Sequence, residues 1–359
     1  MDTVTAMVTD TVMARTRRER TGKMPGRRQN KKLISGCIVA GILTAAVLGS
    51  LAYRTYKEQE DRHVTAGNSI DMKSGYRNIT YNGKEYQYNS LITTILYAGI
   101  DSEGRMETNA GYTQAARADS ISLAVLDKKH KKMTVIALSR DTMTEVRRYS
   151  MSGKDRGMYV THLGYAYTYG DGGKASCENL REAVSELLGG IPIDEYAVTN
   201  QSSMTYINDL VGGVTVKVPN DDLSDRYPEL SAGATVTLDD TNIRDYLHYR
   251  DTAEDLSNEG RIRRQQVYIT AYVEQLKRQL QDDMDGTWKK LESMEDFLQT
   301  SITKNKYISL AKLLETVEFT SDDYCRPEGR NVVGEKHDEF YVDEEALREM
   351  VIGLFYEEI

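Results

Sequence analysis

The 359-residue sequence predicts a layered α/β/α domain with a central mixed sheet, preceded by one transmembrane helix. Apolar strand-like runs alternate along the chain with segments whose apolar residues recur at helical spacing, a pattern typical of helices packed on a sheet. One apolar run near the N-terminus is long enough to cross a bilayer, and a basic segment precedes it.

The predicted anchor covers residues 33–53, a stretch of 21 residues without a charged side chain, close to the ~20 that span a hydrocarbon core. Residues 1–32 carry nine Lys or Arg and three acidic residues. By the positive-inside rule the N-terminus is cytoplasmic and the chain after Tyr53 is extracellular. A cleaved signal peptide is the alternative, but the run exceeds the ~7–15 residues of a signal h-region, so we favour an uncleaved single-span anchor in the cell membrane.

The part of the chain beyond the anchor is acidic. The whole chain has 46 basic and 55 acidic residues; without residues 1–32 it has 37 and 52, a net charge of about −15. Since nucleic-acid binding needs a broad basic face, we expect no nucleic-acid partner. The five histidines follow no zinc spacing. Cys177 and Cys325 would permit one disulfide in an oxidising compartment, although nothing in the sequence shows that they meet.

The first half of the outer part predicts strands followed by a helix. Residues 54–88 are polar and predict a stalk or an edge hairpin. Residues 91–98 predict a buried strand, and the two apolar runs flanking residues 128–132 predict an antiparallel pair. Apolar positions at helical spacing over 180–188 predict a helix that ends at Gly189-Gly190.

The second half continues the alternation. Residues 214–218 predict a strand closed by Pro219, and a long helix is predicted from Arg261. Amphipathic helices are predicted over 308–314 and 345–355. We therefore divide the chain into a basic cytoplasmic tail (1–32), the anchor (33–53), the stalk or edge hairpin (54–88), a core domain (89–282) and a helical and strand part packing on the core (283–359).

Arginines and aspartates stand at the ends of two apolar runs. Arg117 and Asp119 lead into the run 121–126, and Arg140 and Asp141 follow the next run. A charge at the end of a buried strand costs desolvation unless something opposite binds there. Arginine pairs bidentately with phosphate oxygens, and aspartate is a hard-oxygen ligand for Mg²⁺. The pattern predicts a site for a phosphorylated ligand; the alternative is surface charge flanking an ordinary hairpin.

A second basic segment lies at Arg250 and at the start of the long predicted helix. Arg261, Arg264 and Gln265 would share one face of its first turn. The free N–H groups of a helix N-terminus already favour phosphate, and two arginines would strengthen such a site. The alternative is that these side chains pair with acidic residues just upstream.

Two other segments resemble known motifs but lack residues that those motifs require. Residues 170–176 look like a phosphate-binding loop but lack both the Walker A glycine spacing and a Ser or Thr directly after the lysine. Ser139 has no Gly-x-Ser-x-Gly elbow around it, which argues against a serine hydrolase.

Six short sequence blocks form a characteristic series: Arg117–Ser120, Leu138–Thr142, Ala166–Gly170, Asp209–Val214, Tyr249–Asp251 and Gly260–Gln266. Six ordered blocks are far more specific than any one of them. In this order they resemble the LytR-CpsA-Psr family of bacterial cell-envelope enzymes over residues 91–280, and more weakly to residue 359.

The resemblance implies a phosphotransferase that takes a glycopolymer from a polyprenyl-pyrophosphate carrier. The polymer would be joined through a phosphodiester to the C6 hydroxyl of N-acetylmuramic acid in peptidoglycan. An apolar slot between the sheet and a helix would hold the lipid tail. Two other readings stay open: a regulator of transcription or of the envelope, and a membrane-anchored protein that binds polyprenyl phosphate or glycan without catalysis.

The family roles carry over only where residues match. Asp119 and Asp101 would hold Mg²⁺, Asp119 and Arg140 would be catalytic, and Asp119 is also a candidate proton acceptor. The pyrophosphate would be bound by Arg117, Arg140, Arg250, Arg261 and Gln265.

The chain departs from the family pattern at two positions. His248 stands where the family usually has the first arginine of an Arg-x-Arg pair, and its charge near neutral pH is partial at best. Asn258 stands where the family often has an aspartate.

Overall fold

The structure, a computed structural model, describes residues 76–108, 111–249, 257–334 and 337–359. The predicted tail (1–32), the predicted anchor (33–53) and residues 54–75 of the predicted stalk lie outside the described residues. Within the described ranges, no helix has both the length and the apolar character needed to cross a membrane.

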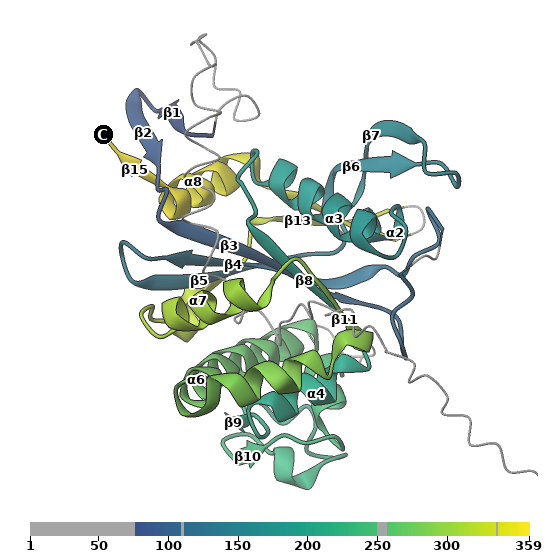
Figure 1. Cartoon of the computed structure of the whole chain (residues 1–359), viewed down its shortest axis with the longest axis vertical. Helices are drawn as coiled ribbons and strands as arrows, with labels where there is room; N and C mark the ends of the chain where they lie inside the picture. Colours follow the sequence, from purple (N-terminus) through teal and green to yellow (C-terminus); the bar gives the residue numbers. More distant parts are fainter. Residues whose placement is uncertain (1–75, 109–110, 250–256, 335–336) are drawn as a thin grey trace, which may run out of the picture. The chain divides into compact units, whose positions relative to one another are not determined.

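A six-stranded mixed sheet forms the centre of the fold, as predicted (Figure 1). In spatial order the strands are β11 (Leu298–Thr300), β8 (Glu195–Asn200), β3 (Ile92–Ile100), β4 (Ala118–Asp127), β5 (Lys132–Leu138) and β12 (Tyr324–Cys325). The neighbours β3, β4 and β5 are antiparallel, whereas β8 runs parallel to β3 and β12 runs parallel to β5.

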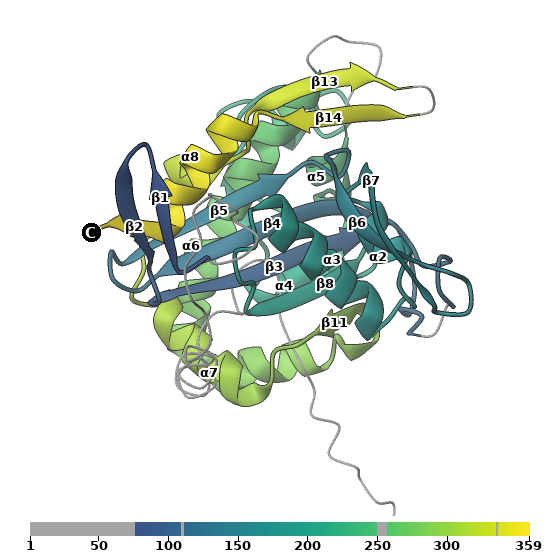
Figure 2. The ribbon, with the colours of Figure 1, turned by 90° about the horizontal axis from the view of Figure 1, so that it is seen from above.

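Both faces of this sheet are covered by helices, with α3 (Lys174–Leu187) and α8 (Glu344–Phe355) on one face (Figures 1 and 2). The other face carries α4 (Ser203–Leu210), α6 (Ser257–Glu292) and α7 (Lys304–Leu314). Side chains of one strand point alternately to the two faces, so Ile95 and Leu96 belong to different cores. Since both faces are buried, the central strands read as nearly continuous apolar runs.

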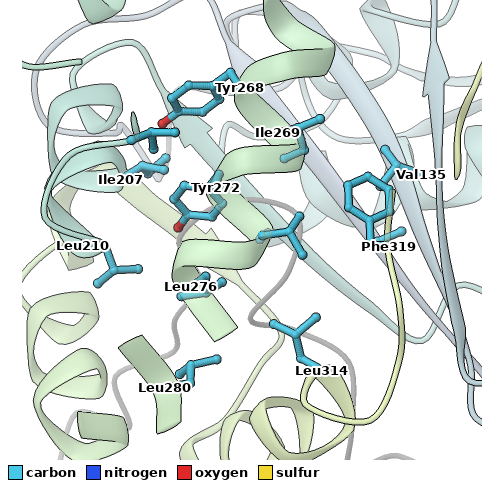
Figure 3. Packing of buried hydrophobic residues seen from close by; sticks show 14 of the residues in the cluster. Val135, Ile207, Leu210, Tyr268, Ile269, Tyr272, Leu276, Leu280, Leu314 and Phe319 are labelled. Carbon is cyan, nitrogen blue, oxygen red and sulfur yellow. The ribbon is translucent and has the colours of Figure 1, made fainter. Parts of the chain in front are cut away.

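The core beneath the sheet is built largely on α6. Figure 3 shows Tyr268, Ile269 and Tyr272 of this helix packing beside Ile207 of α4, with Phe319 next to Val135 of β5. Rings of Tyr268 and Tyr272 stack with centroids 6.0 Å apart. Burial of this apolar face stabilises the helix more than its intrinsic propensity does.

The long helix differs from the prediction at its start. It begins at Ser257, so Arg261 lies in the second turn and the prediction that the helix starts there was wrong. The apolar positions of the helix recur only from Ile262 onward, so the sequence pattern does not mark the first turn. A kink at Asp283 divides the element, and the Asp283 Oδ1 accepts a hydrogen bond from the Gly286 N–H (2.8 Å), restarting the helix.

The predicted edge hairpin is present in its described part. β1 (Asn78–Tyr81) pairs with β2 (Lys84–Tyr88), and β15 (Tyr356–Glu358) pairs with the other side of β2. The predicted strand at 214–218 is β9 (Thr215–Lys217), paired with β10 (Thr235–Thr237). The helix α3 ends before Gly189 and Gly190, whose φ angles of 77° and 85° suit glycine.

Two hairpins and several short elements complete the described chain. The hairpins are β6 (Met143–Tyr149) with β7 (Asp155–His162), and β13 (Gly329–Val333) with β14 (Asp338–Val342). The short elements are α2 (Tyr165–Thr168), α5 (Ile243–His248), η2 (Pro228–Leu230), η3 (Glu295–Phe297) and η4 (Ser321–Asp323).

The two cysteines beyond the predicted anchor are free thiols. Cys177 is buried on α3 and donates a hydrogen bond to the Gln299 Oε1 (3.2 Å), and burial raises the pKa of its thiol. Burial also raises the pKa of Cys325 to about 11. Both thiols are therefore protonated at neutral pH and poor nucleophiles.

Gly260 occupies a tightly packed position in α6. A Cβ there would collide with the Asp222 carboxylate, whereas a Cβ at Gly353 in α8 would meet nothing within 4 Å. We expect Gly260→Ala to lower the free energy of unfolding by ~1–3 kcal/mol through overpacking. Gly353→Ala, the matched control, should raise it by up to ~1 kcal/mol. Urea denaturation measures both, and stabilisation by Gly260→Ala would contradict the packing described.

Candidate functional site

The strand register brings the first charged segment together at one edge of the sheet. Ile100 at the end of β3 pairs with Ala118 at the start of β4, and Leu138 at the end of β5 pairs with Ile121. Asp101, Arg117, Asp119 and Arg140 therefore extend from the same edge, although up to 39 residues separate them in sequence.

One carboxylate is shared by two arginines at this edge. The Asp119 Oδ1 accepts a hydrogen bond from the Arg117 Nε (3.0 Å) and lies 2.7 Å from the Arg140 Nη1. The Arg117 backbone N–H donates to the Asp101 Oδ1 (2.6 Å), and the Arg140 Nε lies 3.6 Å from the Asp141 Oδ1. The three side chains that meet at Asp119 are 26–37% exposed, so a ligand from solvent can reach them.

The electrostatics keep Arg117 charged. Partial burial opposes the charge, but the hydrogen bond and the negative charge of Asp119 outweigh it, and the pKa of Arg117 is raised. The Tyr165 hydroxyl and the Asp101 carboxylate act in the same direction. The Arg117 guanidinium also lies 5.9 Å from the Tyr165 ring centroid, within cation–π range.

Gly164, which no sequence motif marks, brings the segments of this site close together. Gly164 accepts a hydrogen bond from the Ala118 N–H (3.1 Å) and donates one to the Arg140 carbonyl (2.9 Å), which joins the two arginine-bearing strands. A Cβ at this position would lie 2.7 Å from the Ala118 carbonyl and 3.3 Å from side-chain atoms of both Arg117 and Arg140. Gly164 therefore allows the close approach that places Tyr165 against Arg117.

The second segment reaches the same region through the end of α5. Enclosure by the surrounding protein, and then the positive charges of Arg261 and Arg244, lower the pKa of His248. The carboxylates of Asp119 and Asp245 act in the opposite direction. His248 interacts electrostatically with both Arg261 and Asp119. The end of α5 and the start of α6 therefore face the cluster formed by Arg117, Asp119 and Arg140. Arg250 lies outside the described residues.

Arg264 does not share a ligand-binding face with Arg261, contrary to the expectation from helical spacing. It is fully buried, and its Nε donates to the Tyr246 carbonyl (2.8 Å). Its other nitrogens contact the Tyr249 carbonyl and the Asp222 carboxylate. A buried guanidinium must satisfy its donors, and here the end of α5 supplies the acceptors. Arg264 fastens α6 to α5.

Gln265 also bonds to the backbone of α5, because its Nε2 donates to the Leu247 carbonyl (3.0 Å). This bond fixes the amide beside the region of His248. A contact between Gln265 and a ligand stays a prediction.

The described residues contain no group of three or more His, Cys, Asp or Glu side chains that could hold a metal ion. Asp101 and Asp119 do fit a cation that takes most of its ligands from elsewhere. Each uses its Oδ1 for a hydrogen bond to Arg117, which leaves the Oδ2 of each as a hard-oxygen donor. Mg²⁺ is usually held by one or two carboxylates together with phosphate oxygens and water.

Comparison with known proteins decides the family. The sequence model of the LytR_cpsA_psr family matches residues 52–351. This chain belongs to the LytR-CpsA-Psr family. The assignment confirms the resemblance read from the six sequence blocks.

Other family members have related sequences and the same fold. The polyisoprenyl-teichoic acid–peptidoglycan teichoic acid transferase TagU of Bacillus cereus is 24% identical over 264 residues, 72% of this chain and 76% of TagU. The crystal structure of Bacillus subtilis TagV is 23% identical and has a TM-score of 0.54, covering 73% of this chain and 96% of TagV. A structure of TagT bound to LIIa-WTA is 19% identical, with a TM-score of 0.54, over 73% of this chain and 89% of TagT. At these identities the structural likeness shows the fold.

His248 gives the site a testable pH dependence. Its lowered pKa leaves it neutral above pH ~6.5, so it adds positive charge only as the pH falls below that value. We expect His248→Arg to bind inorganic pyrophosphate about 3–10-fold more tightly than the wild type at pH 7.5, with a smaller advantage at pH 5.5.

Calorimetry on the full chain in detergent measures this effect. Comparing the two proteins at each pH cancels the ligand's own titration. His130→Arg, at the opposite end of β4 where His130 contacts Asp127, is the control and should change neither affinity. A His248→Arg advantage that stayed constant with pH would show that His248 does not titrate in this range.

Proposed function

We propose that this chain transfers a glycopolymer from a polyprenyl-pyrophosphate carrier to peptidoglycan, at the C6 hydroxyl of a muramic acid residue. The observation that carries the proposal is the pair of arginines, Arg117 and Arg140, that share the Asp119 carboxylate at a solvent-accessible edge. Membership of the LytR-CpsA-Psr family and relatives named as teichoic acid transferases support it.

The reaction needs charge stabilisation more than covalent work by the protein. The acceptor hydroxyl oxygen forms a bond to the phosphorus that bears the glycopolymer. The bond from that phosphorus to the bridging oxygen of the pyrophosphate breaks, and polyprenyl phosphate leaves with the electron pair. Charge spreads over the phosphate oxygens in such a transition state, and positioned guanidiniums stabilise it.

The same cluster provides a candidate for the proton acceptor. When the pyrophosphate takes the guanidiniums of Arg117 and Arg140 in bidentate contacts, Asp119 loses its two internal partners. This released carboxylate is a candidate acceptor of the hydroxyl proton. The role competes with binding of Mg²⁺ by Asp119, because a metal-bound carboxylate is a weaker base. Arg261 would add charge from α6, and Arg250 from the segment between α5 and α6.

Asp101 and Asp119 would hold Mg²⁺ through their remaining oxygens. When bound, the ion would neutralise charge that develops on the pyrophosphate. The apolar layer between the sheet and α6 would accept the prenyl chain, since its lining is built from residues such as Ile95, Ile207 and Ile269.

We place the catalytic domain outside the cell, held by a single span at residues 33–53 with the N-terminus in the cytoplasm. The charge asymmetry around that run supports this topology. It also brings the site to the side of the membrane where peptidoglycan lies. A transcriptional regulator would need its acidic domain on the other side.

Arg140→Ala should separate catalysis from stability. We expect transfer to fall by about 100-fold or more, because a guanidinium that meets the transferring phosphate is lost. The free energy of unfolding should change by less than ~1 kcal/mol, since the ion pair is over one-third exposed and Asp119 keeps Arg117. The measurement is transfer of a labelled carrier-linked polymer to polymer-free peptidoglycan, beside urea denaturation of the same protein.

Arg264→Ala is the control for this experiment. Loss of a buried guanidinium should lower the free energy of unfolding by about 3 kcal/mol, and its residual activity should follow the folded fraction. Equal behaviour of the two variants would make Arg140 structural. Carrier binding without turnover in the wild type would instead make the protein a non-catalytic binder.

The metal and the carrier should depend on each other. Because Mg²⁺ would use phosphate oxygens as ligands, we expect a short polyprenyl pyrophosphate to raise Mg²⁺ affinity at least tenfold, and Mg²⁺ to raise carrier affinity by the same factor. Calorimetric titration in both orders measures the coupling, and Asp119→Asn should abolish most of it. Equal carrier affinity with and without Mg²⁺ would remove the metal from the mechanism.

A further inference from the structure

A groove of about 920 Å³ is lined by residues of the β13–β14 hairpin and of the start of α8. Figure 2 shows that these elements are neighbours. The volume of the groove is at the upper end of the ~300–1,000 Å³ range of small-molecule sites. Phe340 and Tyr341 of β14 are among its lining residues. The charged side chains around it are Arg326, Glu328, Arg330, Asp343, Glu344, Glu345 and Arg348.

Two of the three arginines of this groove, Arg326 and Arg330, are exposed, and Arg348 is partly buried. Among the described residues, these three arginines form no ion pair, although acidic side chains line the same groove. The Arg330 guanidinium carbon lies 5.7 Å from the Tyr341 ring centroid, within cation–π range. Asp343, by contrast, caps α8 by accepting from the Glu345 and Ala346 N–H groups.

The hairpin that lines the groove is hydrogen-bonded to segments next to the candidate active site. The Phe340 backbone N–H donates to the Asp141 carbonyl (2.8 Å), and Phe340 bridges Thr142, two residues after Arg140. A second link connects the His162 Nε2 and the Asp338 carbonyl (3.1 Å), and His162 contacts Tyr165, which lies against Arg117. A long ligand in the groove could therefore extend to the reacting phosphate.

The balance of positive and negative side chains in the groove favours one class of ligand over another. Three arginines face four acidic side chains, so the lining has no positive excess for a phosphate-rich polymer. Mixed donors and acceptors beside aromatic rings instead suit a glycan with amide groups and short peptides that carry both signs of charge. Arginine pairs well with peptide carboxylates, and aromatic rings provide apolar area together with a polar edge.

We propose that this groove holds the acceptor, a peptidoglycan glycan strand with its stem peptides, and directs one muramic acid hydroxyl to the Arg117–Asp119–Arg140 cluster. The inference rests on the proposed function. It assigns the acceptor to the C-terminal hairpin and α8, and leaves the carrier-linked donor at the strand edge.

The test measures binding, which requires no turnover. Soluble, polymer-free peptidoglycan fragments are titrated into the full chain in detergent, for the wild type and for a double variant, Arg330→Ala with Arg348→Ala. We expect the fragments to bind at least about tenfold more weakly to the double variant, while inorganic pyrophosphate binds equally to both. Arg278→Ala, at an exposed arginine of α6, is the matched control and should leave both affinities unchanged.

Three results would overturn the proposal: no fragment binding by the wild type, equal fragment affinity in the double variant, or a matching loss of pyrophosphate affinity that would assign the groove to the donor. Thermal midpoints of all proteins show whether folding is unchanged. A second variant, Asn331→Asp, keeps the arginines and should weaken fragment binding less than the double variant. If the fragments bind at the groove but no polymer is transferred, the proposed function is wrong and the assignment of the groove still stands.

Discussion

The site is organised around a single carboxylate shared by two guanidiniums. Asp119 holds Arg117 and Arg140 in place before any ligand arrives, so less side-chain entropy is lost when a phosphate binds. The same contact competes with the ligand, because each arginine must leave or share Asp119. An exposed ion pair contributes only about 0–1 kcal/mol. Asp119 therefore competes only weakly with the ligand for the arginines, while it still positions their side chains before the ligand binds. The sheet register makes this arrangement possible, since it puts three strand ends at one edge.

The backbone around the cluster is as important as its charges. Gly164 packs against both arginines, and Arg264 ties α6 to the end of α5 from a fully buried position. Gly164 thus sets the spacing between Arg117 and Arg140, and Arg264 sets the position of α6. Neither needs to contact a ligand, yet both determine where ligand-binding side chains can stand.

The sequence predicted those parts of the structure whose residues repeat at regular spacing. β3, β4 and β5 were evident because burial on both faces makes their apolar runs continuous. β8 escaped notice because it is fully buried yet contains Glu195, Thr199 and Asn200. Glu195 and Thr199 are satisfied by contacts that only the fold brings together, such as the one between Thr199 and the Tyr97 hydroxyl (2.9 Å). The β13–β14 hairpin is largely exposed, so it lacks the alternation that marks a half-buried strand. In the other hairpin β7 is also largely exposed, and only β6 alternates, with Thr144 and Val146 buried.

The candidate site could be predicted in part for the same reason. Arg117, Asp119 and Arg140 were found because they flank apolar runs, and antiparallel pairing then brings them together. Spacing alone could not distinguish Arg261 from Arg264, because both project from one side of α6 and only the position of α5 decides which is buried. Gly164 gave no signal, since a lone glycine shows a close approach only when the approaching atoms are known.

The pairing of β15 with β2 has a consequence for how the protein is made. Tyr356 pairs with Tyr88, so the last strand completes a sheet that begins near the first described residues. Contacts between residues so distant in sequence form slowly, because a long loop must close first. During synthesis one edge of the β1–β2 hairpin therefore stays unpaired until Tyr356–Glu358 has emerged. An exposed strand edge invites pairing with other chains, so this interval is where we expect the nascent protein to depend most on protection from aggregation.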